Sequence, residues 1–183
     1  MKKYILIAGV NGAGKSTLFS LIPSLSKINK INLDETVRNI GDWRDVKAVI
    51  EAGKIIVDRI NDYFDSGESF CQETTLCGKS ILRNVNRAKQ LGYSIEMHYV
   101  GLESVELAKE RVKNRVIHGG HGIADEDIER RYVETFKNLQ IVLPQCDLAA
   151  IYDNTESFRR FAIYKEGTCV RLSSRIPAWY QRI

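Results

Sequence analysis

Two kinds of apolar pattern alternate along this chain. Short, almost continuous apolar runs are typical of strands that are buried on both faces. Runs of this kind occupy residues 3–9, 30–35, 69–75, 93–102 and 146–154. Between them, apolar residues recur every three or four positions, which predicts amphipathic helices. These helices cover residues 15–23, 43–66, 79–91, 103–117 and 125–143.

The order of the segments predicts the fold class. Strands that alternate with helices favour an α/β domain with a mainly parallel sheet, here of five strands. Residues 160–173 differ, because two apolar stretches flank Glu166-Gly167, and this pattern predicts a hairpin. A length of 183 residues fits a single domain over residues 1–183. We expect the hairpin and a tail within about residues 156–183, where the hairpin either extends the sheet or covers its edge.

The composition is that of an ordinary globular protein and narrows the function only a little. Hydrophobic residues make up 44% of the chain and charged residues 27%, so a packed core is expected. The net charge of +4 is too small to argue for nucleic acid, which we regard as an unlikely partner, and it suits anionic small substrates equally well. The cysteines Cys71, Cys77, Cys146 and Cys169 include no pair at zinc-ligand spacing, so we expect reduced thiols.

The start of the chain predicts where the protein is found. Two lysines and a short apolar run lead directly into a glycine-rich loop, which is typical of a first β-strand and not of a signal peptide. No apolar segment is long enough to cross a membrane. We therefore expect a cytoplasmic protein that has no contact with a membrane.

The most informative motif is "GVNGAGKST" at residues 9–17, which fills every position of the phosphate-binding Walker A pattern between a strand and a helix. Its glycines let backbone N–H groups turn inward around phosphates, and the helix N-terminus adds partial positive charge. Lys15 is expected to reach the outer phosphates, and the Ser16 hydroxyl to hold Mg²⁺. The motif thus predicts binding of ATP or GTP with Mg²⁺. The predicted nucleotide-binding residues of the loop are Gly9, Asn11, Gly12, Ala13, Gly14, Lys15, Ser16 and Thr17.

Acidic and hydroxyl side chains follow the second and third predicted strands. Ligands collect at the carboxyl ends of parallel strands, so Asp34, Glu73 and Thr75 are expected beside the loop. A carboxylate there can take the proton of an acceptor hydroxyl as it attacks the γ-phosphate. Asp34 is the candidate for this role, and the same residue is also suited to cap a helix. Glu73 and Thr75 share one face of an extended segment and could hold a sugar, whereas Glu73 could instead hold the water shell of Mg²⁺.

Positive charge is concentrated in residues 109–131. A kinase needs cations of its own to meet the charge that spreads over the transferred phosphoryl group. The glycine-rich "HGGHG" at residues 118–122 joins two predicted helices, so we expect the segment to be a lid that closes over the phosphates. The alternative is that these charges form a solvated helix surface. The cationic residues of the segment are Lys109, Arg111, Lys113, Arg115, Arg130 and Arg131.

His118 and His121 in this turn raise the question of a metal site. No carboxylate or cysteine completes a set of metal ligands around them, so we do not expect one. The glycines also indicate a turn that is too flexible to hold ligands in place.

Four blocks of the sequence together resemble the zeta-toxin-like P-loop kinases. The blocks are "GVNGAGKST", "INLDE", "ETTL" and "RVKNRVIHGGHGIADEDIERRYVETFKNL". The last block is especially similar to a branch of predicted ATPases that carries "GGH…DI.RRY…NL". The resemblance covers most of residues 3–155, and the order of the blocks is far more specific than the Walker motif alone. It implies a three-layer P-loop kinase-like sandwich, similar to that of small nucleoside and shikimate kinases, and transfer of phosphate from ATP or GTP to a hydroxyl.

The resemblance also implies roles for single residues. Asp34 corresponds to the general base, and Glu73 and Thr75 correspond to groups that hold the acceptor. The implied catalytic residues are Lys15, Asp34, Arg115 and Arg131, and Arg130 is expected on the acceptor side. "YDNT" at residues 152–155 falls where the nucleotide base is expected. The residues implied to hold the nucleotide beyond the loop are Arg111, Arg115, Asp153 and Asn154.

The acceptor and the partner of this chain are implied by the resemblance alone. The characterised toxins phosphorylate the sugar of UDP-N-acetylglucosamine, so a small molecule such as this nucleotide sugar is the implied acceptor. An antitoxin-like protein is the implied partner, although no feature of the sequence indicates one. Cys77 stands where the toxins carry an arginine, and Lys79 is a nearby cation.

Two other functions remain as alternatives to a small-molecule kinase. The first is a nucleotide-binding ATPase that acts as a regulatory module, for which the aromatic tail "IPAWYQRI" could be the contact surface or could pack back on the domain. The second is a nucleic-acid end kinase, which would need a basic groove with aromatic side chains. The charge of this chain is too evenly spread to predict such a groove.

Overall fold

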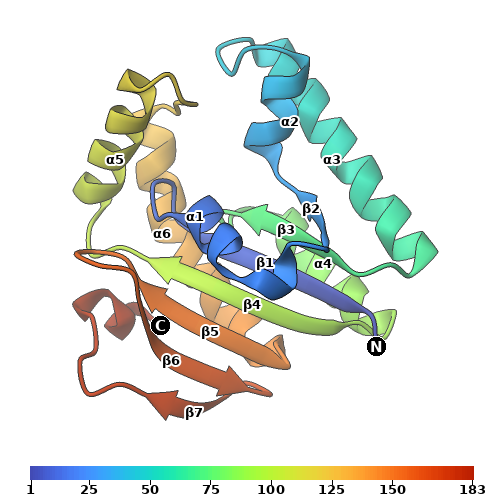
Figure 1. The fold of residues 1–183 in the computed structure, drawn as a ribbon, viewed down its shortest axis with the longest axis vertical. Coiled ribbons are helices and arrows are strands. Elements are labelled where there is room, and N and C mark those ends of the chain that lie inside the picture. Colours follow the sequence, from blue (N-terminus) through green and yellow to red (C-terminus); the bar gives the residue numbers. More distant parts are fainter.

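The computed structural model describes residues 1–183 and has a single seven-stranded sheet at its centre, with the strand order β2-β3-β1-β4-β5-β6-β7 (Figure 1). Strands β1 to β5 are parallel, whereas β6 and β7 pair antiparallel with their neighbours. The strands are β1 (Lys3–Gly9), β2 (Asn29–Ile31), β3 (Phe70–Thr74), β4 (Ser94–Gly101), β5 (Leu148–Asp153), β6 (Arg159–Lys165) and β7 (Thr168–Leu172). The predicted α/β class is confirmed, and the predicted hairpin extends the sheet.

The helices agree with the predicted segments, with one addition between the second strand and the third. They are α1 (Lys15–Leu21), α2 (Leu33–Ile40), α3 (Val46–Ser66), α4 (Lys79–Gln90), α5 (Val105–Ile117) and α6 (Asp125–Val142), with 3-10 turns η1 (Pro23–Leu25), η2 (Leu143–Gln145) and η3 (Ala178–Arg182). None of these helices has the length and the apolar character needed to span a membrane.

The added helix α2 begins where the sequence pattern predicts the end of a strand. Strand β2 stops at Ile31, and the side chain of Asn32 accepts a hydrogen bond from the backbone N–H of Glu35 at 3.2 Å. Asn32 is therefore the N-cap of α2, which satisfies one of the free N–H groups of the first turn. Asp34 lies inside that first turn, so its carboxylate is not used as the cap.

The two faces of the sheet carry cores of very different size. Along β1, Ile5 and Ile7 pack with Leu25 of η1 in a small cluster beneath α1. The alternate residues Tyr4 and Leu6 point to the other face, where the large core lies against α4 and α6. This period of two follows from the pleat of the strand. The sheet is thus a middle layer, with α1 on one side and α4 and α6 on the other (Figure 1).

Two arms rise from the edge at which the parallel strands end. Figure 1 shows α2 and α3 as one arm, and α5 with the beginning of α6 as the other. The ends of β1 and β3 lie between them. Because the P-loop follows β1 directly, this arrangement places the phosphate-binding loop at the base of the space between the arms.

The aromatic tail packs back on the domain. The side chain of Trp179 is only 2% exposed, and its indole N–H donates to Asp153 Oδ1 at 2.9 Å. Its ring lies against Phe136 and Phe161 in the large core. The alternative in which this tail offers exposed aromatic rings to a partner is therefore not supported by the structure.

Candidate active site

The loop of residues 9–17 is shaped by glycines that no other residue could replace without strain. The backbone of Gly12 has a φ of 76°, which is in the left-handed region. A Cβ atom on Gly12 would lie 2.9 Å from the carbonyl oxygen of Ala108 and 3.1 Å from the Cβ of Arg111. The loop is thus packed against α5, at the start of a helix N-terminus of the kind that can bind a phosphate.

The segment after β5 closes over the loop from the other side. The amide of Asn154 donates to the carbonyl oxygen of Ala13 at 2.9 Å, and Arg111 donates to the carbonyl oxygen of Thr155 at 3.0 Å. Asp153 is occupied within the fold, because its carboxylate accepts hydrogen bonds from Thr155 and Trp179. The residues expected near the nucleotide base therefore lie beside the P-loop, and contact of Asp153 or Asn154 with a nucleotide stays a prediction.

Lys15 extends along the loop and donates to the carbonyl oxygen of Val10 at 3.1 Å. Burial lowers the pKa of its ammonium group, while the negative charges of Glu73 and Asp34 raise it and the positive charge of Arg115 lowers it further. Groups that act on one ammonium in this way share a small region. The structure thus brings together charged residues from the P-loop, β3, α2 and α5.

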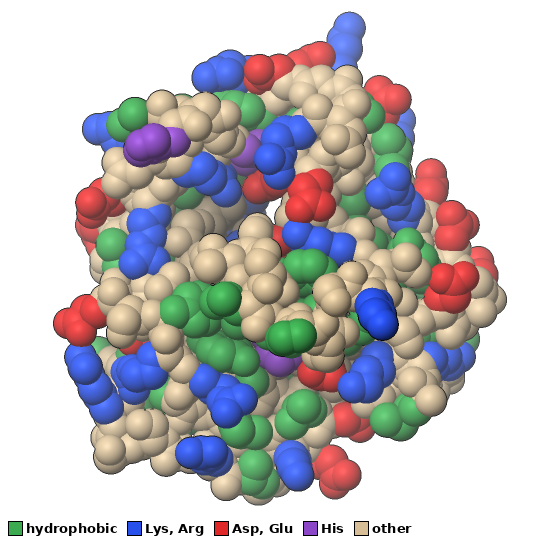
Figure 2. All heavy atoms as spheres, in the orientation of Figure 1, with side chains coloured by type: hydrophobic (Ala, Val, Ile, Leu, Met, Phe, Trp, Pro, Cys, Tyr) green, Lys and Arg blue, Asp and Glu red, His purple; other side chains and the backbone are tan.

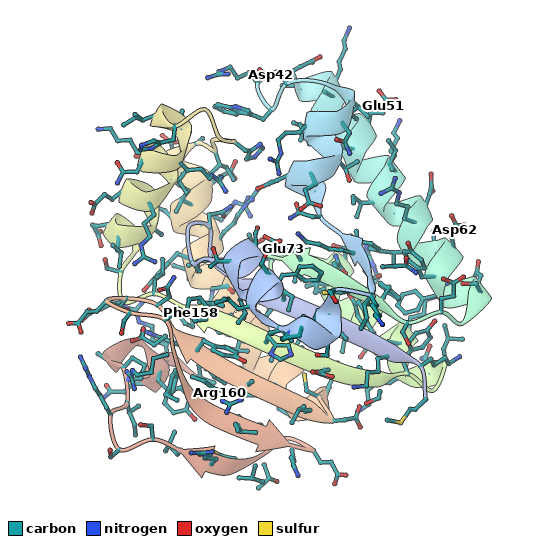
Figure 3. The ribbon with its side chains drawn as sticks, in the orientation of Figure 1. Asp42, Glu51, Asp62, Glu73, Phe158 and Arg160 are labelled. Atoms are coloured by element: carbon teal, nitrogen blue, oxygen red, sulfur yellow. The ribbon has the colours of Figure 1, made fainter.

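Glu73 lies at the end of β3, directly beside the serine of the Walker motif (Figure 3). The Ser16 hydroxyl is 3.0 Å from both carboxylate oxygens of Glu73. The amide of Asn32 donates to the same carboxylate at 2.7 Å, and the ammonium of Lys30 lies 3.5 Å from it. Glu73 is therefore held in place by the cap residue of α2 and by a cation of β2.

Asp34, on the arm of α2 and α3, faces the other arm, the lid arm, which consists of α5 and the beginning of α6. One carboxylate oxygen, Oδ2, is 3.6 Å from Nη1 of Arg115, and the other, Oδ1, is 3.4 Å from Nε2 of His121. The remaining guanidinium nitrogens of Arg115, Nε and Nη2, are buried and have no hydrogen-bond partner. Buried N–H donors without partners are costly unless a ligand completes them. Figure 2 shows a hollow between the lid arm and α2 on this face of the molecule.

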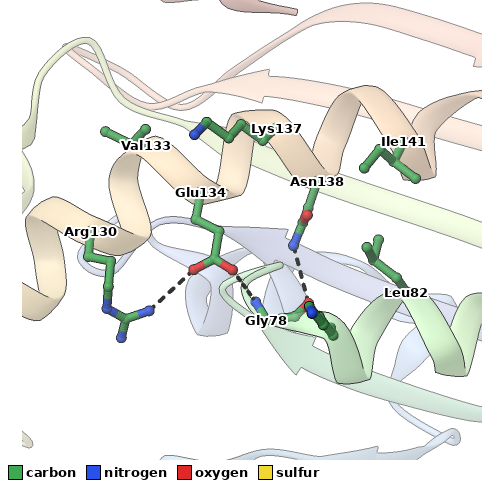
Figure 4. Close-up of a pocket in the computed structure, with 9 residues that line it drawn as sticks. Gly78, Leu82, Arg130, Val133, Glu134, Lys137, Asn138 and Ile141 are labelled. Atoms are coloured by element: carbon green, nitrogen blue, oxygen red, sulfur yellow. Dashed lines mark hydrogen bonds and ion pairs between the residues drawn. The ribbon is translucent and has the colours of Figure 1, made fainter.

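The two adjacent arginines of α6 point in different directions. Arg130 is exposed and pairs with Asp127 at 2.6 Å and with Glu134 at 3.2 Å. Figure 4 shows it at the rim of a separate cavity of about 690 Å³ between α4 and α6, where Glu134 also accepts from the backbone N–H of Gly78. Arg130 was expected on the acceptor side, together with Asp34. The structure instead pairs it with Asp127 and Glu134 on the surface.

Arg131 and Thr75 lie nearer to the site, at the loop that follows β3. The thiol of Cys77 donates to the carbonyl oxygens of Thr75, at 3.3 Å, and of Arg131, at 3.4 Å. Burial raises the pKa of Cys77, so it stays a thiol and a donor. Burial lowers the pKa of His121, and the positive charge of Arg131 is the smallest of the causes that lower it further.

Two comparisons by sequence concern the family of this chain. No family model matches it. An uncharacterized protein of Haemophilus influenzae (strain ATCC 51907 / DSM 11121 / KW20 / Rd) is 34% identical over 130 residues, which cover 71% of this chain and 92% of that protein. The chain belongs to the family of this Haemophilus protein.

Comparison with solved structures establishes the fold. A chain of the AvrRxo1-ORF1:AvrRxo1-ORF2 complex, crystallised with sulphate ions, has a TM-score of 0.74 and 13% identity, and covers 100% of this chain. The same complex crystallised with ATP has a TM-score of 0.67 and 12% identity, over 93% of this chain. The PezAT toxin-antitoxin system of Streptococcus pneumoniae gives 0.61 and 19% identity, over 86% of this chain and 71% of that chain. The chain thus has the α/β, P-loop kinase-like fold of these structures, and this similarity agrees with the resemblance that its motifs show.

The extent of these matches differs between the relatives. This chain spans only 63% and 60% of the lengths of the two AvrRxo1 chains. At such low identity the likeness concerns the arrangement of the elements and not the chemistry of their side chains.

Sequence reasoning missed three residues of the site. Lys30 and Asn32 precede the "LDE" block and contact Glu73 only because β2 lies beside β3 in the sheet. His121 was considered only as a metal ligand, and the structure places it against Asp34. A signal was present for Asn32, because a polar residue of this type before a helix is typical of an N-cap. No local signal existed for the other two contacts.

Proposed function

We propose that this protein is a phosphotransferase that moves the γ-phosphate of ATP to a hydroxyl group of a small molecule. The observation that carries the proposal is the contact between Asp34 and Arg115, in which Nη1 lies 3.6 Å from Oδ2, beside the P-loop lysine Lys15, on whose ammonium both charges act. A carboxylate, a phosphate-binding ammonium and a guanidinium around one hollow are the groups that phosphoryl transfer needs. The P-loop kinase-like fold, and a relative crystallised with ATP, support a nucleotide as the donor.

Ser16 and Glu73 fit a magnesium ion that accompanies the nucleotide. Their hydroxyl and carboxylate oxygens are 3.0 Å apart, and oxygen ligands of this kind are the ones that Mg²⁺ prefers. When bound, the ion would neutralise charge on the phosphates. We therefore assign Glu73 to the magnesium water shell rather than to the acceptor.

Each remaining group has a defined task in the proposed reaction. Asp34 takes the proton of the acceptor hydroxyl while the oxygen of that hydroxyl bonds to the γ-phosphorus. The bond from that phosphorus to the bridging oxygen of ADP breaks at the same time. Lys15 and Arg115 stabilise the negative charge on the transferred group. The two buried N–H donors of Arg115 that have no partner are suited to this task, because phosphate oxygens would satisfy them.

The acceptor that we propose is a nucleotide sugar such as UDP-N-acetylglucosamine. Support comes from the zeta-toxin-like motifs, which lie on elements that the fold places around one hollow. A protein partner stays a prediction: the PezAT relative belongs to a toxin-antitoxin system and the AvrRxo1 chains form a complex, and only the fold connects this chain with them.

The test of the proposal is the substitution Asp34→Asn, which removes the base and keeps the shape of the side chain. The wild-type protein is incubated with ATP, Mg²⁺ and a panel of nucleotide sugars, and the gain of one phosphate is followed by mass spectrometry. We expect the variant to lose transfer by about 10³-fold, because general-base catalysis contributes about 10² to 10⁴. Its affinity for ADP should stay within about threefold. Asp42→Asn, on an exposed residue of the same arm, is the matched control.

Three results would contradict the proposal or redirect it. Transfer retained by Asp34→Asn would remove Asp34 as the base. Release of phosphate without any labelled acceptor would support a nucleotide-operated regulatory ATPase instead. Labelling of oligonucleotide ends in a parallel reaction would support a nucleic-acid end kinase.

A further inference from the structure

The glycine-rich turn that joins α5 and α6 brings an imidazole to the proposed base. Nε2 of His121 lies 3.4 Å from Oδ1 of Asp34, and the side chain of His121 is only 15% exposed. Its other ring nitrogen, Nδ1, is buried and has no hydrogen-bond partner. Asp34 is thus the only polar partner that the fold gives to this ring. The distance is longer than an ordinary N–H···O hydrogen bond, as contacts of this kind often are before substrate binds.

Close packing holds the turn in position, and the packing explains its glycines. A Cβ atom on Gly122 would lie 2.6 Å from the ring of Trp43 and 2.9 Å from a methyl group of Val116. A Cβ atom on Gly120 would lie 2.6 Å from Cγ of Arg115. The ring of Trp43, on the other arm, is 5.5 Å from the His121 ring. The turn therefore connects the two arms, and a larger side chain at Gly120 or Gly122 would disturb the packing on either side of the imidazole.

The surroundings of His121 decide which nitrogen carries the proton. Burial lowers the pKa of His121, the negative charge of Asp34 raises it, and the positive charges of Arg115, Arg38 and Arg131 lower it. These charges come from α2, α5 and α6, the elements packed around the ring. The imidazole is therefore neutral at pH 7 and has a single N–H. That N–H belongs on Nε2, because a bare Nε2 lone pair would face a carboxylate oxygen.

We propose that His121 is a positioning residue for Asp34. Its Nε2–H donates to Oδ1 of Asp34 and so keeps Oδ2 directed at the acceptor hydroxyl. This inference rests on the proposed function. Arg115 faces Oδ2 at 3.6 Å and has free donors that can turn to a phosphate. His121 has no second partner, so it stays with Asp34 when Arg115 turns to a phosphate. The proton of the acceptor goes to Asp34, and His121 keeps its own proton throughout.

Kinetics of two His121 variants test the proposal. His121→Leu removes the donor, and we expect kcat to fall about 30-fold, within the range that orientation of a catalytic group can supply, with KM for ATP changed by less than about twofold. His121→Gln places an amide N–H near the position of Nε2 and should retain kcat within about threefold. His118→Gln is the control, because His118 is exposed and bonds to Asn114 within its own helix. Equal loss in the Leu and Gln variants would overturn the proposal.

The pH profile provides a readout that a purely structural role would not change. When His121 takes up a second proton, the added charge makes Asp34 a weaker base, and a buried Nδ1–H appears without a partner. Since the pKa of His121 is lowered from 6.5, this loss of kcat should occur below that pH in the wild type. His121→Gln cannot titrate, so its acid limb should move to lower pH. An acid limb that is identical in the two proteins would contradict the proposal.

A measurement without activity separates this inference from the proposed function. In ¹⁵N NMR spectra of the full chain, we expect His121 to carry its proton on Nε2. The substitution Asp34→Asn should lower the pKa of His121 further, because it removes the charge that raises it. A proton on Nδ1, or a titration that ignores Asp34→Asn, would overturn the inference. If these signals are as expected and no acceptor is ever phosphorylated, only the proposed function fails.

Discussion

The nucleotide side and the acceptor side of the site are built in different ways. The proposed nucleotide side is one continuous stretch, residues 9–17, in which glycines with positive φ turn the backbone at the start of α1. The proposed acceptor side consists of single side chains from separate segments: Asp34 from α2, Arg115 from α5 and His121 from the following turn. A backbone cradle depends on local conformation, whereas the acceptor side depends on how the arms pack.

This difference leads to opposite expectations for substitutions. On the acceptor side, the loss of one side chain should remove one task and leave nucleotide binding intact. On the nucleotide side, a change should affect every later step, because all of them need the bound phosphate. The predictions below run from the largest expected effect to the smallest.

Lys15→Ala should have the largest effect, because Lys15 is the point at which the two sides meet. We expect transfer to fall by at least about 10³-fold, since the ammonium stabilises the charge of the transferred group. The affinity for ATP should fall as well, by about tenfold. Transfer assays and calorimetric titration with ADP measure the two effects. Lys27→Ala, on an exposed lysine, is the control. Transfer retained by Lys15→Ala would contradict the proposal that both sides of the site depend on this lysine.

Arg115→Ala and Arg130→Ala form a matched pair from the same lid. Arg115 faces Asp34, and its loss should lower transfer by about 10²-fold, the size expected when a charged donor to the transition state is removed. Arg130 pairs with Asp127 and Glu134 on the surface, so its loss should change transfer by less than about threefold. Equal losses in the two variants would mean that the lid rearranges when it binds substrate.

Glu73→Gln separates the two roles that this carboxylate could have. In the magnesium role, kcat should fall by about 10-fold to 100-fold and more Mg²⁺ should be needed for half-maximal rate, since the charge near Ser16 is lost. A titration with Mg²⁺ at saturating ATP measures this. If only the KM for the acceptor rises, Glu73 belongs to the acceptor side. Glu68→Gln, at an exposed glutamate before β3, is the control.

Gly122→Ala tests whether packing of the arms supports the acceptor side alone. The added methyl would lie 2.6 Å from Trp43, so the free energy of unfolding should fall by about 1–3 kcal/mol. The transfer rate should fall a few-fold, while the affinity for ADP stays unchanged. Gly53→Ala is the control, since nothing lies within 4 Å of its Cβ position in α3, and it should raise stability by about 0.5–1 kcal/mol. Chemical unfolding and calorimetry provide both values.

Glu96→Gln should have the smallest effect on the site, because Glu96 lies in β4, outside both sides. Its pKa is lowered from 4.5 to about 2 by a hydrogen bond with His98 and by Lys3. Its contribution to stability, about 1–3 kcal/mol, is therefore complete above pH 4.5 and is lost as the pH falls towards 2. The stability gap between wild type and variant should shrink over this range, with transfer unchanged at pH 7. A gap that does not vary with pH would contradict the assignment.

The sequence predicts most of the fold because periodicity and turn chemistry are local. The helix boundaries of α4 and α6 follow from apolar spacing, and the hairpin turn at Glu166-Gly167 has both residues in the left-handed region. The short strand β2 was predicted to run on to residue 35, because the pattern "INLDE" continues through the N-cap Asn32. An N-cap is the kind of signal that overrides hydrophobic spacing.

The nucleotide side of the site could also be read from the sequence, whereas the acceptor side could be read only in part. Asp34 and Arg115 were expected to lie near each other from the motifs, and the structure does place them side by side. Arg130 and Arg131 were both expected at the site, but neighbours on a helix differ by about 100° in direction, and only tertiary packing decides which faces the site. The contact of His121 with Asp34 joins residues 87 positions apart and leaves no local trace.

The amide of Asn154 closes the phosphate loop from 141 positions further along the chain. During synthesis, the complete Walker motif therefore leaves the ribosome long before the strand that supports it. A growing chain should be unable to grip ATP until β5 has joined the sheet, because domains form their distant contacts late. The order of synthesis therefore makes the proposed binding of nucleotide depend on a segment that is made more than a hundred residues after the loop.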